Sequence, residues 1–365
     1  MDLQLEEKLA RGVARYTRRA SAGRAERALV QTDEEILEKL ERRIGRLHAK
    51  QRIGIENDRE ARVFGQGLNF FHPENWRRSP AVVRTALQLT GLYWRARKNA
   101  ENVQIRHNDI QLPRLPSSFD GLRLLHISDL HADISGGAMQ RLMELLPSLS
   151  YDLCVLTGDY RGKTFGPFDA TIAGMARVCA HIDGPIYGVL GNHDSIRMVP
   201  ALEEMGIRML LNEAEALERG DQHIHLVGID DAHYYRADNI EKAASHLSAH
   251  DFSILLSHTP EIYRQAAHAD FDLLLSGHTH GGQICLPGAI PITLDSVLPR
   301  RMGSGAWKYR DMVGYTSVGV GSSILAARVN CPPEITLHRL RCGVASMADR
   351  AGATHRTREK AIPHQ

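Results

Sequence analysis

The chain is organised around the segment Leu275-Ser-Gly-His-Thr-His-Gly-Gly-Gln283. A mostly apolar run from Phe271 to Leu275 reaches a glycine, and two histidines follow two positions apart. Imidazoles at positions i and i+2 of a turn can point into one pocket, where each neutral ring offers a nitrogen to a divalent metal. One such pair is weak evidence. Four earlier places in the chain, however, repeat the order of apolar run, short turn and then Asp, His or Asn.

The composition is that of an ordinary globular protein with one large or two modest domains. The chain has 365 residues, is 43% hydrophobic and 24% charged, and carries a net charge of +2. It can therefore build a full core, and its charge gives no argument for nucleic acid as a partner. Its five cysteines are scattered without a CxxC pair, which is typical of reduced thiols. The acidic N-terminus lacks the apolar core of a secretory signal, and no apolar run is long enough to span a membrane, so we expect a cytoplasmic protein.

Residues 1–100 predict a helical extension in front of the main domain. A capping box at Thr32 and Glu35 begins an apolar stripe at helical spacing. The stripe consists of Ile36, Leu40, Ile44 and Leu47. Two interpretations stay open, because a narrow stripe suits either a helix resting on the main domain or a helix that binds a second copy or a partner.

Residues 76–98 predict a basic amphipathic helix with Pro80 in its first turn. The apolar face would be formed by Val83, Ala86, Leu87, Thr90 and Trp94. The basic flanks would be formed by Arg77, Arg78, Arg84, Arg95, Arg97 and Lys98. Such a helix can lie on an anionic membrane surface, peripheral to the inner face of the membrane. It can equally pack on the catalytic domain and keep a solvated basic face.

From residue 103 onward the pattern is that of alternating strands and helices. Residues 103–112 alternate like a half-exposed strand, and three apolar runs then end at Ile127, Leu156 and Leu190 with helical segments between them. This order indicates right-handed βαβ units. The second half is richer in strands, and a second sheet facing the first would bury its apolar runs. Residues 103–341 therefore predict a catalytic domain, and the polar residues 342–365 predict a disordered tail.

Seven polar residues stand just past the carboxyl ends of these apolar runs. They are Asp129, His131, Asp159, Asn192, His258, His278 and His280. In α/β sheets this edge is where ligand sites form. Seven oxygen and nitrogen ligands are too many for one tetrahedral zinc and suit two neighbouring metal ions that share a carboxylate. Mixed ligation of this kind favours manganese, with iron, zinc or cobalt as alternatives, over calcium or magnesium.

Each of these residues has an ordinary explanation when it is taken alone. An Asp after a strand is commonly a turn or cap residue, and a single histidine is commonly a buried core residue. An ordered set of seven is poorly explained in this way, and clustered His and Asp at strand ends are typical of functional sites. His223 and His225 stand inside a strand instead of at its end, so we expect a structural or surface role for them.

The chain resembles the calcineurin-like metallophosphoesterase family in five blocks that occur in the family's order. The blocks are Asp129-Leu-His131, Gly158-Asp159, Gly191-Asn-His-Asp194, His258 and Gly277-His-Thr-His280. Two further segments, Gly281-Gly-Gln283 and Asn330-Cys-Pro-Pro-Glu334, are similar to its YkuE/YaeI-type bacterial phosphodiesterase branch. The resemblance covers residues 103–341. It implies a four-layer αββα sandwich, with two facing mixed β-sheets flanked by helices.

The resemblance also implies a role for each residue of the site. One metal would be held by Asp129, His131 and His280, and the other by Asn192, His258 and His278, with Asp159 bridging them. His193 would protonate the leaving oxygen or stabilise transition-state charge, and Asp194 would orient its ring. A hydroxide bridging the metals would attack phosphorus in line. Many relatives carry an acid or Asn three residues after Gly-Asp, whereas this chain reads Tyr160-Arg161-Gly162, which puts the family's substrate contacts in doubt.

The implied activity is hydrolysis of a phosphodiester or pyrophosphate, and the substrate stays open. The basic segment at residues 76–98, and a loop with basic and aromatic residues predicted from Pro299 to Arg310, favour a phosphodiester or pyrophosphate at a membrane surface, which includes a lipid-linked substrate. The loop can equally be a solvated surface loop without a role in binding. The specific alternative is a pyrophosphatase acting on UDP-diacylglucosamine in lipid A synthesis. An alternative of another class is a non-catalytic metal-binding scaffold. A nuclease is disfavoured by the near-neutral charge.

Overall fold

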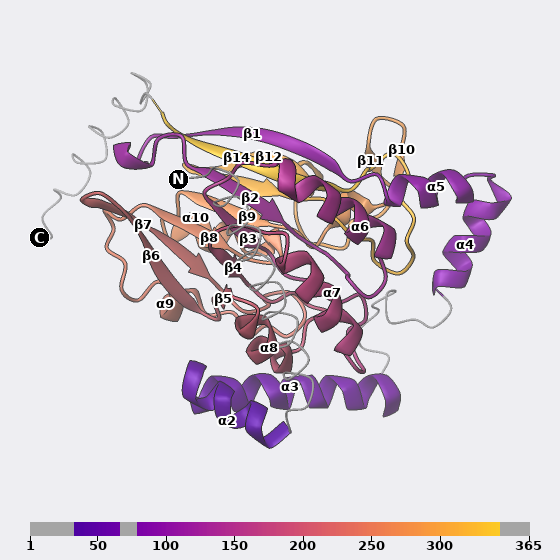
Figure 1. Cartoon of the computed structure of the whole chain (residues 1–365), viewed down its shortest axis with the longest axis horizontal. Coiled ribbons are helices and arrows are strands. Elements are labelled where there is room, and N and C mark those ends of the chain that lie inside the picture. The colour runs from indigo at the N-terminus through magenta and orange to yellow at the C-terminus, as the bar shows by residue number, and fades with distance from the viewer. Residues whose placement is uncertain (1–32, 66–78, 344–365) are drawn as a thin grey trace, which may run out of the picture.

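The computed structural model describes residues 33–65 and 79–343 and leaves out 1–32, 66–78 and 344–365. Two six-stranded sheets face each other, and helices lie outside both (Figure 1). The predicted αββα sandwich is therefore confirmed. The first sheet has the strand order β1-β14-β2-β3-β4-β5, and the second has the order β12-β13-β9-β8-β7-β6. A small third sheet pairs β10 with β11.

The strands of the first sheet are β1 (Gln104–Leu112), β14 (Glu334–Cys342), β2 (Arg123–Ile127), β3 (Leu153–Leu156), β4 (Ile186–Gly188) and β5 (Ile207–Met209). Those of the second are β12 (Gly305–Tyr309), β13 (Met312–Thr316), β9 (Leu273–Ser276), β8 (Ser253–Leu256), β7 (Gln222–Gly228) and β6 (Glu213–Arg219). The strands β2 to β5 run parallel, and so do β7, β8, β9 and β13. Parallel strands place their carboxyl ends at one edge of each sheet.

The inner core lies between the two sheets. Leu124 and Val155 of the first sheet pack in one cluster with Leu226, Ile254 and Leu275 of the second. The strands β3, β8 and β9 are buried along their whole length. This explains their continuous apolar sequences, because a central parallel strand is covered on both faces.

Helices cover the outer faces. The first sheet is covered by α6 (Gly136–Leu145), α7 (Asp169–Cys179) and α8 (Val199–Glu204), and the second by α9 (Ile240–Ala243) and α10 (Tyr263–His268). Short 3₁₀ turns are η2 (Ser117–Phe119), η3 (Leu146–Ser148), η4 (Ile196–Met198), η5 (Pro260–Ile262), η6 (His280–Gly282) and η7 (Arg300–Met302). All five cysteines are free, as expected for reduced thiols.

The helices α2 (Asp33–Ile44) and α3 (Arg46–Gly65) pack against the first sheet's helical layer. Leu40 and Ile44 are buried in the same cluster as Leu202 of α8, so α2 rests on the main domain, as one of the two interpretations holds. Leu47 does not continue the stripe and is 81% exposed. Gly45, with a φ of 90°, breaks the helix before it. The expected cap at Thr32 lies outside the described residues.

The single helix predicted over residues 76–98 is wrong. The described part forms two helices, α4 (Ser79–Leu89) and α5 (Tyr93–Ala100), because Gly91 between them has a φ of 73°. Leu87 is buried as expected, but Trp94 is 75% exposed instead of facing the core. Residues 76–78 lie outside the described part. Within residues 33–65 and 79–343, every helix is too short or too polar to cross a membrane.

The loop predicted from Pro299 to Arg310 is also wrong, because it contains η7 and the edge strand β12. Trp307 points inward, and its Nε1 donates a hydrogen bond to Thr316 Oγ1 at 2.9 Å. Cys342, where the tail was predicted to begin, is the last residue of β14. The remainder of that tail, from residue 344, lies outside the described residues. The boundaries at residues 100 and 103 remain predictions.

Candidate metal centre

All seven predicted ligands lie past strand ends at one side of the sandwich. In the first sheet, Asp129 follows β2, Asp159 follows β3 and Asn192 follows β4. In the second sheet, His258 follows β8, and both His278 and His280 follow β9. The facing sheets bring these turns together, so residues 149 positions apart in sequence come within 3.1 Å.

Five of the seven ligands have backbone angles that L-residues rarely adopt. The φ values are 51° for Asp129, 42° for His131, 55° for Asp159, 72° for His278 and 49° for His280. Strained backbone of this kind persists only where the surrounding structure holds it, and it clusters at functional sites. It turns each side chain sharply out of its strand end and toward the shared centre.

The glycines of the motifs are explained by close packing of these turns. A Cβ on Gly191 would overlap the carboxylate of Asp159, and a Cβ on Gly277 would overlap Ser128 and Asp129. The Gly-Asn-His-Asp and Gly-His-Thr-His blocks therefore need glycine at their first position, since each turn packs directly on a ligand from another strand.

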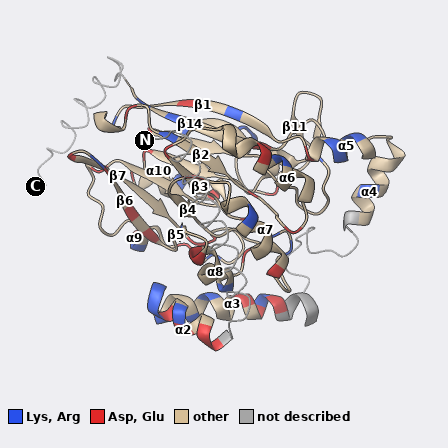
Figure 2. Cartoon of the chain, viewed as in Figure 1, with Lys and Arg blue, Asp and Glu red and all other residues tan. Residues whose placement is uncertain are grey.

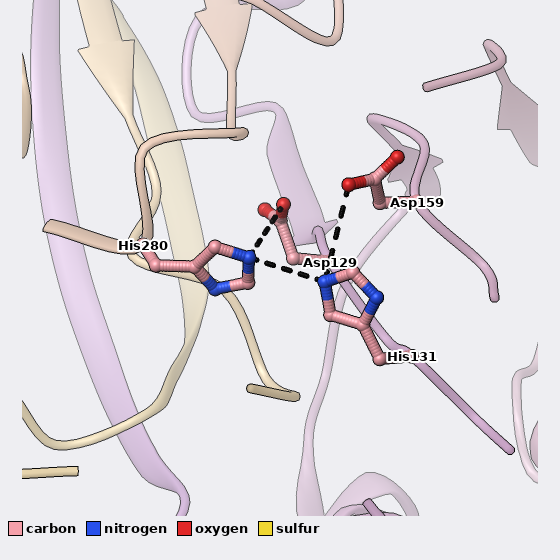
Figure 3. A group of neighbouring side chains, drawn as sticks. All are labelled: Asp129, His131, Asp159 and His280. Carbon is pink, nitrogen blue, oxygen red and sulfur yellow. Dashed lines mark hydrogen bonds and ion pairs between the residues drawn. The ribbon is translucent and has the colours of Figure 1, made fainter. Parts of the chain in front are cut away.

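One group of ligands consists of Asp129, His131, Asp159 and His280 (Figure 3). The Nε2 atoms of His131 and His280 lie 3.1 Å apart, and His280 Nε2 lies 3.6 Å from Asp129 Oδ1. Ligands about 2.1 Å from an ion at tetrahedral or octahedral angles are separated by about 3.0 to 3.4 Å. The spacing of these atoms is therefore that of ligands around one metal ion.

The second group is centred on His258. Its Nε2 lies 2.9 Å from Asn192 Oδ1, 3.2 Å from His278 Nδ1 and 3.3 Å from Asp159 Oδ2. The same Asp159 oxygen lies 3.9 Å from His131 Nε2 in the first group. Asp159 thus stands between the groups, where a bridging carboxylate would have to be.

Hydrogen bonds behind the ligands set which nitrogen faces the centre. His131 Nδ1 is 2.8 Å from the carbonyl of Arg161, and His258 Nδ1 is 2.7 Å from the carbonyl of Thr157. A carbonyl only accepts, so each Nδ1 carries a hydrogen, and in the neutral ring each Nε2 keeps its lone pair for a metal.

Electrostatics favour the metal-binding form at three ligands and oppose it at two. Burial raises the pKa of Asp129, and although burial would lower the pKa of His258, the Asp159 carboxylate outweighs it and raises that pKa to about 10. Burial lowers the pKa of His278 and of His280 well below the usual value, which favours the neutral rings that act as ligands. Burial alone would raise the pKa of Asp159, but the neighbouring His258 and His193 hold it well below the ordinary range. Asp159 is therefore an anion between the two groups.

The carboxylate of Asp194 binds the backbone of the Gly-Asp turn, and its role in orienting the His193 ring stays a prediction. Asp194 accepts hydrogen bonds from the backbone N–H groups of Asp159, Tyr160 and Gly191 at 2.8 to 2.9 Å. The His193 ring has its Nδ1 2.9 Å from Thr164 Oγ1, while its Nε2 lies 3.9 Å from Asp159 Oδ2. The buried amides of the Gly-Asp turn need an acceptor, and Asp194 supplies it.

Arg161, in the Tyr160-Arg161-Gly162 stretch that follows the Gly-Asp turn, holds two loops together. Its guanidinium donates to the backbone carbonyls of His193, Thr164 and Gly166. It therefore ties the loop that carries Thr164 to the turn that carries His193. Arg328 has a similar role in the second sheet. Its buried guanidinium donates to the carbonyls of His280 and Val318 and so joins the turn after β9 to the segment after β13.

His233 is a residue that the sequence did not single out. It lies beyond β7, with its ring centroid 4.2 Å from that of His278 and its Nδ1 2.8 Å from Glu261 Oε2. Burial would lower its pKa, but the Glu261 carboxylate raises it, which favours a cation at the rim of the site. His278 Nε2 has no hydrogen-bond partner among the described residues. His278 also lies close to His233 and Asp295, and these three side chains form a second set of potential metal ligands. The sequence did contain a signal for His233, because the apolar run that precedes it ends at Ile229, at the same sheet edge as the predicted ligands.

Comparison with known proteins gives a consistent result. Residues 122–282, which contain all seven ligands, match the family profile described as calcineurin-like phosphoesterase. YkoQ, an uncharacterised metallophosphoesterase of Bacillus subtilis, is 30% identical over 260 residues, covering 68% of this chain and 94% of the relative. YkuE of the same organism is 28% identical over 272 residues, covering 72% and 94%. The phosphodiesterase YaeI of Escherichia coli is 27% identical over 235 residues, covering 60% and 82%.

Proposed function

The chain belongs to the calcineurin-like phosphoesterase family, and from that premise we propose that this phosphoester hydrolase cleaves a phosphodiester or pyrophosphate at a paired metal centre. The observation that carries the proposal is the position of Asp159 between two ligand groups. Asp129, His131 and His280 belong to one group, and Asn192, His258 and His278 belong to the other. A phosphate that spans both groups would be held by two of its oxygens.

The ligand set fits two divalent cations. Oxygen and neutral imidazole ligands suit manganese, with iron, zinc or cobalt as alternatives. When bound, such a pair supplies Lewis acidity, which polarises phosphoryl oxygens and lowers the pKa of water at the centre. Manganese is the metal with which the activity should first be tested.

The chain's own residues hold the substrate and move the proton. Thr164 fixes the His193 ring through Nδ1, which leaves Nε2 on the side of Asp159 and the centre. From there, His193 donates a proton to the leaving oxygen or stabilises its developing charge. His233, made more basic by Glu261, adds positive charge at the rim, where a second phosphate or a leaving group would lie.

The proposal is tested by two substitutions that separate chemistry from metal binding. With bis-p-nitrophenyl phosphate and Mn²⁺, His193→Ala should lose about 10²- to 10⁴-fold in turnover and keep its metal. Asp159→Asn should lose metal from both groups, as measured by elemental analysis. Normal turnover in His193→Ala would refute the assigned role. Undiminished metal content in Asp159→Asn would refute the proposal that the Asp159 carboxylate is shared by two metal ions.

A second candidate function is hydrolysis of a lipid-linked nucleotide pyrophosphate of the UDP-diacylglucosamine type. The observation that favours it is the exposed apolar surface of α4 and of the segment after the ligand turn. A panel of monoester, diester, cyclic nucleotide and nucleotide-lipid substrates would decide between the two candidates. The complete ligand set argues against a non-catalytic scaffold.

A further inference from the structure

The exposed apolar side chains of the protein are concentrated in two segments. Within the described residues, eight large apolar side chains are strongly exposed, and seven of them lie in α4–α5 or in residues 286–297. The seven are Val82, Leu89, Trp94, Leu286, Ile290, Ile292 and Val297. The eighth is Leu47, at the start of α3. Scattered single residues need no explanation, but a concentration of this kind marks an interaction site.

These two segments are neighbours in space, although they are far apart in sequence. Leu87 of α4 and Ala96 of α5 form one buried cluster with Ala327 and Val329, and Ile284 packs against it. Ile284 directly precedes β10 (Cys285–Leu286), which pairs with β11 (Ile290–Pro291). Figure 1 shows this hairpin beside α5. We call α4–α5 together with the β10–β11 hairpin the docking surface.

The charge of the docking surface has a single sign along its helices. Residues 79–100 contain no Asp or Glu, and their charged side chains are Arg84, Arg95, Arg97 and Lys98, all exposed. Figure 2 shows only blue charges on α4 and α5, whereas α2 and α3 carry both signs. Exposed apolar side chains with basic neighbours are the chemistry of a protein surface that enters the headgroup region of an anionic bilayer.

The charge pattern also distinguishes between two possible binding partners of the docking surface, a second copy of the chain and an anionic lipid bilayer. A two-fold contact between two copies would place the same surface on both sides, so Arg95, Arg97 and Lys98 would approach their own copies. Like charges in such a contact are destabilising. An anionic lipid surface pairs with every basic residue and takes up the apolar side chains at the same time.

The docking surface is joined directly to the metal centre. The ligand turn η6 begins at His280, and the hairpin starts five residues later, at Cys285. Gln283 between them holds the connection, since its Nε2 donates to the carbonyls of Ser323 and Leu325 and its Oε1 accepts from the N–H of Ser323. A bilayer that covers the hairpin therefore lies next to the ligands of β9.

We propose that the docking surface binds an anionic phospholipid bilayer and so presents the metal centre to a phosphoester whose apolar part stays in the bilayer. The docking itself is independent of the chemistry, whereas the substrate class rests on the proposed function. The lipid is recognised by its negative headgroups and its acyl region, not by a specific headgroup structure.

The test is sedimentation of the full chain with vesicles of phosphatidylcholine, alone or mixed with phosphatidylglycerol. The wild-type protein should bind the mixed vesicles, and added salt should weaken the binding. Two apolar double variants, Leu89→Ser with Trp94→Ser and Leu286→Ser with Ile290→Ser, should each bind about tenfold more weakly. Replacement of Arg95, Arg97 and Lys98 by Gln should have a similar effect and remove the preference for phosphatidylglycerol.

Leu47→Ser is the matched control, because it makes the same change at an exposed side chain outside the docking surface. It should bind like the wild type. The proposal is overturned if the wild type stays in solution with mixed vesicles, or if Leu47→Ser weakens binding as much as the surface variants do. It is equally overturned if the surface variants bind vesicles normally but turn a dimer into a monomer in size-exclusion chromatography, since a second copy would then cover the surface.

Activity separates this inference from the proposed function. Hydrolysis of bis-p-nitrophenyl phosphate in solution should be the same in the wild type and in the surface variants, because these residues are not ligands. Hydrolysis of a phosphodiester embedded in mixed vesicles should fall with vesicle binding. If the wild type binds vesicles but hydrolyses neither substrate, the docking stands and the proposed function falls. Equal hydrolysis of the embedded diester by all variants would overturn the substrate part of the inference.

Discussion

The helical pair α2–α3 and the pair α4–α5 both precede the first strand and both pack on the sandwich through apolar side chains, but α2–α3 adds a buried charge. The α3 helix is fixed by a buried charge, since the Arg52 side chain is fully enclosed and donates to Asp230, Glu56 and the carbonyl of Asp194. The α4–α5 pair is fixed by a small apolar cluster around Leu87. Buried charges need their partners and so specify one position, whereas a small apolar contact leaves a face free for another surface.

The charged attachment reaches the catalytic turn. Glu56, four residues after Arg52, accepts hydrogen bonds from Ser195 Oγ at 2.6 Å and from the N–H of Ile196 at 2.7 Å. These residues directly follow the Gly-Asn-His-Asp block that carries His193. The α3 helix thus packs behind the turn that carries His193, the proposed acid, and this helix lies outside the matched family region.

The largest effect is expected for Arg52→Met. It removes the fully buried cation between Asp230 and Glu56, which keep only His48 and Arg197 as basic partners among the described residues. Loss of one partner from a buried pair costs about 3 to 5 kcal/mol of unfolding free energy. Urea denaturation of the full chain measures this loss. The control is Arg43→Met on α2, whose half-buried pairs with Glu203 and Glu213 should contribute only about 1 kcal/mol. Equal losses for both variants would remove the distinction between a buried and a peripheral attachment.

Glu56→Gln tests whether α3 positions the catalytic turn. The amide keeps the shape of the side chain but removes its charge, which should cost about 2 kcal/mol of stability. The turn would lose its fixed position, so we expect kcat to fall about tenfold with KM and metal content unchanged. Glu56→Asp should recover part of kcat. A fall in stability with no change in kcat would make Glu56 structural and nothing more.

Local patterns explain what the sequence could predict. The seven predicted ligands follow five apolar runs, and a strand end with a polar turn can be recognised without knowing the rest of the fold. The parallel arrangement then brings the strand ends together. The sheets, the facing layers and the convergence of these seven residues could therefore be predicted from one sequence.

The sequence could not predict the roles of residues that act on partners far away in the chain. Arg52 acts on residues 142 and 178 positions away, and no local pattern marks it. Asp194 was assigned to its neighbour His193, and its hydrogen bonds to the amides of a turn about 35 positions earlier were not predicted. The helix breaks at Gly45 and Gly91 could not be predicted either. A glycine inside a helical pattern costs only about 1 kcal/mol, so its presence alone does not show that the helix ends there.

Acid should weaken the α3 attachment selectively. Burial would raise the pKa of Asp230, but Arg52 and His48 hold it below the ordinary value of 3.8. A depressed pKa contributes stability that is present above the unfolded-state pKa and is lost as the pH falls through the folded-state pKa. The unfolding free energy of the wild type should therefore fall on acidification below that range. The slope should be shallower in Arg52→Met, and equal slopes would show that this pair does not carry the acid sensitivity.

The smallest effect is expected on the outward face of α5. Trp94 is 75% exposed, and exposed substitutions away from special features change stability by less than about 0.5 kcal/mol. Trp94→Ser should therefore unfold at the same urea concentration as the wild type, while Leu87→Ala, on the buried face of α4, should accelerate hydrogen exchange in α4–α5 but not in α3. A large loss of stability in Trp94→Ser would mean that the tryptophan is needed for folding. The apolar face of this helical pair would then be part of the core, and the contrast with α2–α3 would disappear.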